Sequence, residues 1–136
     1  MMKSVAALFG AAALVLTITA APAAEEDMNS ANFIVPGCRA FMDQKPQDDL
    51  LRQGLCTGIV RGIAAMGTFM NFSLDLHPLP ENDYRRRGLC MDAPDEITLG
   101  QELRVVVAYI EARPERMHES FEWLALQALR TAWPCR

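Results

Sequence analysis

Four cysteines in a chain of 136 residues constrain the fold more than any other feature of the sequence: Cys38, Cys56, Cys90 and Cys135. An even number of cysteines in a small exported protein is typical of disulfides, whereas a structural zinc site needs closely spaced ligands such as C-x-x-C. No C-x-x-C pair occurs here. We therefore expect two disulfides, and the sequence alone leaves all three pairings open.

The N-terminal segment predicts export. Lys3 precedes an apolar run from Val5 to Ile18, and Ala21-Pro22-Ala23 offers a small-residue cleavage site. This order is typical of a secretory signal peptide over residues 1–23, removed near Ala23. An uncleaved membrane anchor is the alternative, but the apolar run is near the lower length limit for crossing a bilayer. Residues 24–136 then form a single domain, and the bacterial periplasm is the expected compartment.

The charge of the mature chain excludes one class of partner. The full chain has 13 basic and 17 acidic residues, and removal of Lys3 leaves 12 against 17, a net charge of −5. Binding to nucleic acid depends on basic residues that release counterions, so we expect no nucleic-acid partner. We also expect no further membrane-spanning segment after the signal peptide.

Apolar residues at steps of three and four predict an all-α domain of four main helices, or four to five with short ones. The first runs from Ser30 to about Asp43 and is broken or restarted at Pro36. Thr98 and Gln101 form a capping box at the start of a helix that ends near Ala112. The last runs from Pro114 to Trp133, and Trp123 and Trp133 are both assigned to its core side.

The second helix, from about Asp49 to Met70, combines an apolar stripe with a row of glycines. The stripe predicts the core-facing side and consists of Leu51, Leu55, Ile59, Ile63, Met66 and Met70. Each glycine weakens a helix by about 1 kcal/mol, so we expect a neighbouring helix to pack closely on them, locked there by Cys56. These helix-packing glycines are Gly54, Gly58 and Gly62. A membrane dimer motif is the alternative, and Arg52 and Arg61 argue against it.

Residues 71–96 lack a helical period and predict a long connection. Within it, Tyr84, Arg85 and Arg86 are candidate partner-binding residues, because tyrosine and arginine contribute disproportionately to interfaces. The alternative is a solvated run of charges. A connection whose end is held by Cys90 would lose less entropy on docking than a free one.

No catalytic set is found in the sequence. Glu115 and His118 have the spacing used in carboxylate di-metal bundles, but those sites need two such motifs and two further glutamates. A partly exposed helical pair is the simpler interpretation. No nucleophile elbow or phosphate loop occurs either. We therefore expect no enzyme, no cofactor and no metal.

Several segments together resemble the type VI secretion amidase immunity proteins of the Rap/Tai type. They are VPGCRAF, GLCTGIVRGI, the stretch that begins ITLGQELRVVV and continues through PERMH, and the terminal WPC. The resemblance covers most of the mature chain apart from the leader and parts of the central connection. Residues 71–89 show no family pattern, and specificity for a partner is usually found in such variable surface.

The resemblance implies an all-helical periplasmic protein, usually a homodimer, that binds a peptidoglycan-cleaving amidase and blocks its active-site cleft. It implies no catalysis, and mostly structural roles for the shared motif positions. The pairings then favoured are Cys56 with Cys90 and Cys38 with Cys135. The alternative function is a periplasmic stress or acid chaperone that exposes apolar surface at low pH, with carboxylates supplying the pH dependence.

Overall fold

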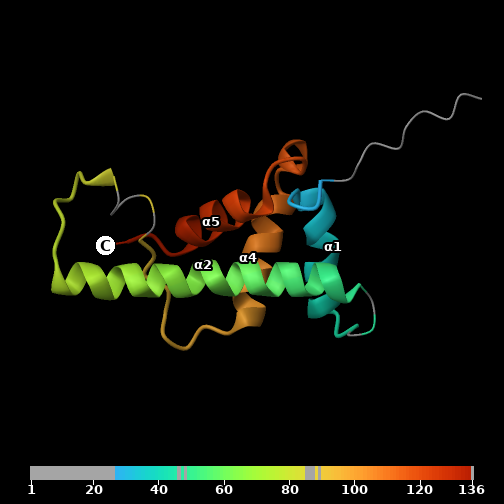
Figure 1. Ribbon diagram of the computed structural model, residues 1–136, viewed down its shortest axis with the longest axis horizontal. Coiled ribbons are helices and arrows are strands. Elements are labelled where there is room, and N and C mark those ends of the chain that lie inside the picture. Colours follow the sequence, from blue (N-terminus) through green and yellow to red (C-terminus); the bar gives the residue numbers. More distant parts are fainter. Residues whose placement is uncertain (1–26, 46, 48, 85–87, 89, 136) are drawn as a thin grey trace, which may run out of the picture.

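A computed structural model describes residues 27–45, 47, 49–84, 88 and 90–135. The described elements are α1 (Ala31–Met42), α2 (Leu50–Leu76), α4 (Leu99–Glu111), the short 3₁₀ helix η1 (Pro114–Arg116) and α5 (Phe121–Ala132). The all-α prediction is confirmed. Figure 1 shows α2 running the length of the molecule, with α1 at one end and the chain's C-terminus toward the other. The predicted signal peptide lies outside the described residues.

Side-chain caps lie at the starts of α1, α2 and α4, and the capping box of α4 was predicted from the sequence. The Ser30 hydroxyl accepts a hydrogen bond from the backbone N–H of Phe33, and Asp49 caps α2 in the same manner. Thr98 and Gln101 form the complete capping box of α4. Such side-chain acceptors satisfy backbone donors that have no partner inside the helix, so they favour helix starts at these positions.

The two proline expectations need correction. Pro36 does not break α1, which continues through it. Its ring is on the exposed side of the helix, where water can satisfy the carbonyl that loses its hydrogen bond. Pro114 starts only the single turn η1, and α5 begins seven residues later at Phe121, capped by Ser120. The second helix is also longer than predicted and ends at Leu76 rather than near Met70.

The core lies where α1, α4 and α5 meet the inner side of α2. The apolar stripes predicted for α4 and α5 are confirmed: Leu103, Val106 and Ile110 are fully or almost fully buried, as are Phe121 and Leu124. Burying each such side chain contributes about 1.5–3 kcal/mol relative to exposing it, so these helices supply much of the driving force for folding.

The predicted inner face of α2 is right only in part. Leu55, Ile59 and Ile63 are partly buried and pack against the core, whereas Leu51 is 60 % exposed and Met66 is 51 % exposed. The buried residues of this helix, Gln53, Cys56, Val60 and Gly67, were not part of the predicted stripe. Gln53 is tolerated there because its amide donates to the Lys45 carbonyl at 2.8 Å, as a buried polar group requires.

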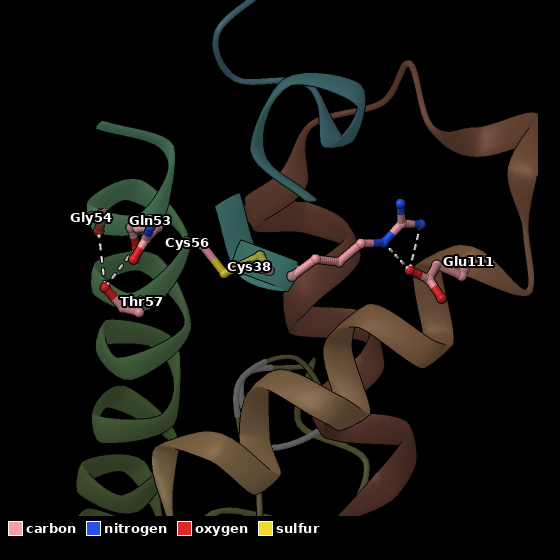
Figure 2. The surroundings of a disulfide bond; sticks show 7 residues. Cys38, Gln53, Gly54, Cys56, Thr57 and Glu111 are labelled. Atoms are coloured by element: carbon pink, nitrogen blue, oxygen red, sulfur yellow. Dashed lines mark hydrogen bonds and ion pairs between the residues drawn. A yellow bond between two sulfur atoms is a disulfide. The ribbon is translucent and has the colours of Figure 1, made fainter. Parts of the chain in front are cut away.

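The disulfides join Cys38 to Cys56 and Cys90 to Cys135, with Cα–Cα distances of 5.4 and 5.5 Å. Two bridges were expected, but the pairing favoured by the resemblance is wrong. Cys38 meets Cys56 because α1 lies against the first turns of α2, as Figure 2 shows. The second bridge closes at the far end of the molecule, where Met91 pairs with Pro134.

The glycine row does not pack against another helix in the part of the chain that the structure describes. A Cβ atom built at Gly54, Gly58 or Gly62 would meet no atom within 4 Å. The close approach occurs at Gly37 of α1 instead, where a Cβ would lie 2.3 Å from the backbone carbonyl carbon of Arg52. A glycine does allow two helices to pack closely, as expected, but it is Gly37 of α1 and not the glycine row of α2.

By length and composition alone, α2 could cross a membrane. From the sequence, no membrane-spanning segment was expected after the signal peptide. It has 27 residues and a mean hydropathy of 1.2 in its most apolar window, of which 17 % is buried inside the protein. Helices of soluble proteins can pass the same test, so this is weak evidence for a membrane. It does show that the exposed side of α2 is unusually apolar.

Candidate binding surface

The most distinctive surface is the side of α2 that faces away from the core, here called the outer face. At 3.6 residues per turn its members fall within about 120° of the helix circumference. All are exposed and none is charged. They are Leu51, Gly54, Gly58, Gly62, Ala65, Met66, Phe69, Phe72 and Leu76. An uncharged apolar strip of this length marks an interaction surface more often than ordinary solvent-exposed helix.

A hollow of about 470 Å³ adjoins the outer face between α2 and α5. Gly62 and Met66 line it from α2, and Trp123 and Leu126 line it from α5. Trp123 is 52 % exposed, so its assignment to the core is wrong, whereas Trp133 packs against the core as predicted. The hollow therefore extends the apolar outer face sideways onto α5.

The candidate residue Tyr84 lies beyond the end of α2 and is 78 % exposed. Arg85 and Arg86 lie outside the described residues. Tyr84 does not line the hollow between α2 and α5, so the structure keeps it apart from that surface. The connection that carries Tyr84 is held at both ends. The end of α2 holds one side, and the Cys90–Cys135 bridge holds the other.

Three contacts fix the segment that follows this connection. The Asn71 side-chain amide donates to the Met91 carbonyl. The Asp92 backbone N–H donates to the Trp133 carbonyl at 3.1 Å, beside the Met91–Pro134 pair. The shared terminal motif Trp-Pro-Cys thus anchors the connection to the body of the protein.

The junction between α4 and α5 is held by a polar cluster. Arg116 binds Glu119 through two hydrogen bonds of 2.7 Å and donates to Gln127 at 2.9 Å. Gln127 also accepts from the Tyr109 hydroxyl at 3.1 Å. The hydrogen bonds from Arg116 lower the pKa of Glu119, so this pair stabilises the fold at neutral pH and loses that effect as the pH falls. Arg116 of the Pro-Glu-Arg-Met-His motif therefore has a structural role at this junction.

One acidic residue is buried at the contact of α4 with α2. Glu102 is 2 % exposed, and its Oε2 has no hydrogen-bond partner among the described residues. Arg61 approaches its other oxygen at 3.7 Å and is itself largely exposed. Burial raises the pKa of Glu102, and the positive charge of Arg61 opposes that increase. The folded protein therefore binds a proton at Glu102 more readily than the unfolded chain.

We expect Glu102→Gln to raise the free energy of unfolding at pH 7 by about 1 kcal/mol, because it removes a buried charge that is incompletely paired. The gain should fade below about pH 4, where the carboxyl is protonated in both states. Urea unfolding at several pH values measures it. Arg61→Ala is the companion variant and should lower stability at pH 7, because Glu102 then loses its only described counter-charge. A Glu102→Gln variant less stable than wild type at pH 7 would contradict this account.

Most of the shared motif positions have structural roles in the described structure. Gly37 permits helix contact, the four cysteines form bridges, and Thr98 with Gln101 caps a helix. The exposed Phe69, Phe72 and Trp123 were missed by sequence reasoning. One signal in the sequence could have revealed Phe69 and Phe72. Small and apolar residues without charge recur at helical spacing from Leu51 to Leu76. Among the described residues, no three His, Cys, Asp or Glu side chains are grouped to hold a metal ion.

Comparison with known families supplies the identity. The family described as Rap1a immunity proteins matches residues 30–135, from the cap of α1 to the last cysteine. Neither the curated proteins nor the solved structures include a significant match. The family match covers most of the chain and every described helix. This protein therefore belongs to the Rap1a immunity protein family.

Proposed function

We propose that this protein is an exported, non-catalytic immunity protein that binds a secreted peptidoglycan amidase in the periplasm and blocks its active-site cleft. Membership of the Rap1a immunity family supports a role against a secreted effector. The sequence resemblance to type VI amidase immunity proteins supports the choice of an amidase, the periplasmic location after removal of residues 1–23, and a homodimeric state.

The observation that carries this proposal is the connection after α2. It presents Tyr84 almost fully to solvent and is fastened at its far side by a disulfide. Tyrosine combines a large apolar ring with a hydrogen-bonding hydroxyl, which makes it effective in protein interfaces. Because both ends of the connection are held by the body, docking costs less conformational entropy than for a free loop.

The proposed function is tested with a purified peptidoglycan amidase secreted by the type VI system of the same or a neighbouring strain. The mature protein should form a stable complex with it and stop the release of cleaved peptides from purified peptidoglycan at a stoichiometric ratio. An amidase from an unrelated autolysis system is the control and should remain active. Absence of both binding and inhibition with the secreted amidases would exclude this function.

We expect the double variant Tyr84→Ala/Arg86→Ala to weaken binding to that amidase by about 30-fold or more, since interface anchors are typically worth at least about 2 kcal/mol. Isothermal titration calorimetry measures the affinity. Arg104→Ala, an exposed arginine on α4, is the charge-matched control and should bind as wild type. Unchanged affinity of the double variant would show that the connection is not the contact surface.

The exposed outer face favours a second candidate, a chaperone-like protein that holds unfolded clients on apolar surface. Light scattering distinguishes the two functions. A chaperone would suppress the aggregation of several unrelated proteins near pH 3, where acid-induced unfolding is common. Protection restricted to a single secreted partner would support the immunity function instead.

A further inference from the structure

The glycine row of α2 lowers the stability of the helix, and no contact among the described residues offsets that loss. Three glycines inside a helix cost about 3 kcal/mol relative to alanine. Gly54, Gly58 and Gly62 gain no contact in return, because the space where each Cβ would stand is open to 4 Å. Alanine would fit at each position without a clash. A helix surface without side chains is useful when another backbone or a large side chain must come close.

Large apolar side chains continue the same face toward the C-terminal end of α2. Phe69, Phe72 and Leu76 are each 60–62 % exposed. Together with Leu51 and Met66 they expose on the order of 500 Å² of apolar surface, taking roughly 150–250 Å² for a large side chain. Two such faces would bury about 1,000 Å² before backbone and Trp123 are counted, close to the lower limit of about 1,200 Å² for a specific interface.

The order of sizes along the outer face makes it complementary to itself. Its first half is nearly bare and its second half is bulky. If a second α2 runs antiparallel about a two-fold axis between residues 63 and 64, Gly58 stands opposite the partner's Phe69. Gly62 then stands opposite the partner's Ala65, and Leu51 opposite the partner's Leu76. A parallel pair would instead set phenylalanine against phenylalanine and leave the glycines facing each other across a gap.

We propose that the outer face of α2 is an isologous interface, on which the α2 helix of a second copy of this chain packs antiparallel with its phenylalanines over the glycines. Two-fold symmetry requires one patch that fits itself, and this strip does. The proposal deepens the homodimeric state included in the proposed function by naming its surface and orientation.

A lipid bilayer is the other apolar environment that could cover this face. Arg61, close to the middle of α2, is largely exposed, and Asp75 near its end is exposed as well. Charged side chains within a membrane-spanning helix are costly. At a dimer interface both can remain at the edge of the strip in contact with water. The charges therefore favour a second copy over a membrane.

The first test is a pair of glycine variants of the mature full-length chain, studied without any effector. Gly58→Leu should convert the dimer to a monomer and weaken self-association by 100-fold or more in sedimentation equilibrium. It should retain its helix content, because the site is open within one chain. Gly100→Leu, at a glycine in the first turn of α4 where a Cβ would make only ordinary contacts of 3.9 Å with the Thr98 and Arg104 side chains, is the matched control and should remain a dimer.

The second test fixes the orientation. On a straight helix, residues 51 and 76 are about 37 Å apart at 1.5 Å per residue, so no disulfide can join them within one chain. The variant Leu51→Cys/Leu76→Cys, mildly oxidised and mapped without reduction, should yield a 51–76 cross-link in a covalent dimer. Dominant 51–51 and 76–76 cross-links would show a parallel pair and overturn the proposed orientation.

Three results would overturn the interface itself. The first is a wild-type protein that is monomeric at about 100 µM, a concentration well above the dissociation constants of stable dimers. The second is a Gly58→Leu variant that dimerises as wild type does. The third is a wild-type protein that is monomeric in buffer but sediments with phosphatidylethanolamine–phosphatidylglycerol vesicles. Because none of these measurements involves an amidase, failure here leaves the proposed inhibition standing. Failure of inhibition likewise leaves the interface standing.

Discussion

Replacing Gly37 by alanine is expected to lower the free energy of unfolding by about 3 kcal/mol or more, the upper end of the effect of overfilling a packed core. The added Cβ would lie 2.3 Å from the carbonyl carbon and 2.5 Å from the carbonyl oxygen of Arg52. These are backbone atoms of α2, so they cannot rotate away as the end of a flexible side chain would. The two helices would have to separate next to the Cys38–Cys56 bridge.

Urea denaturation followed by circular dichroism measures this effect. Gly100→Ala is the matched control, because it makes the same chemical change in α4, away from the outer face, where the new methyl group would lie no closer than 3.9 Å to its nearest neighbours, the side chains of Thr98 and Arg104. It should leave stability unchanged or raise it by up to about 1 kcal/mol. If both variants unfold at the same urea concentration as wild type, α1 and α2 do not approach as closely as described.

Removing either disulfide is the second change with a large expected effect. In the chain-entropy account, Cys38→Ala/Cys56→Ala should cost about 3 kcal/mol and Cys90→Ala/Cys135→Ala about 4 kcal/mol. The difference follows from sequence separations of 18 and 45 residues, since a longer loop gains more freedom when it is released in the unfolded chain. The second variant should also weaken binding to the amidase, because the connection carrying Tyr84 loses an anchor.

Two measurements check these expectations. Peptide mapping of the unreduced protein should yield only the 38–56 and 90–135 linked peptides, and a 56–90 peptide would contradict the described fold. Urea denaturation of the double variants then gives the two stability losses. A variant lacking the Cys90–Cys135 bridge that keeps both wild-type stability and wild-type affinity would show that this bridge supports neither the fold nor the connection.

Features that depend on neighbouring residues could be predicted from the sequence. The all-α class, the helix starts near Ser30 and Asp49, the capping box at Thr98, and the buried stripes of α4 and α5 were predicted and are confirmed. Caps act within one turn, and a helical stripe is fixed by a period of 3.6 residues. Such signals are complete within a short stretch of chain.

The candidate surface was predicted only in part. Tyr84 was singled out by its residue type, and it is indeed exposed. Leu51 and Met66 of the outer face were assigned to the core side of α2, because apolar periodicity indicates that a side of a helix is covered but not what covers it. A helix can pack on its own chain with one side and on a partner with the other. Such a helix has two apolar stripes, and the sequence does not show which of them faces the core.

By itself, the sequence determined that this chain forms capped helices held by two disulfides, and its motifs placed it among immunity proteins. Only the tertiary structure decided which cysteines pair, which glycine lets helices touch and which side of α2 faces inward. Those outcomes depend on how α1 lies against α2 and on where the C-terminus returns. They are contacts between segments far apart in the chain, and the spacing of residues within one segment does not determine which distant segment it contacts.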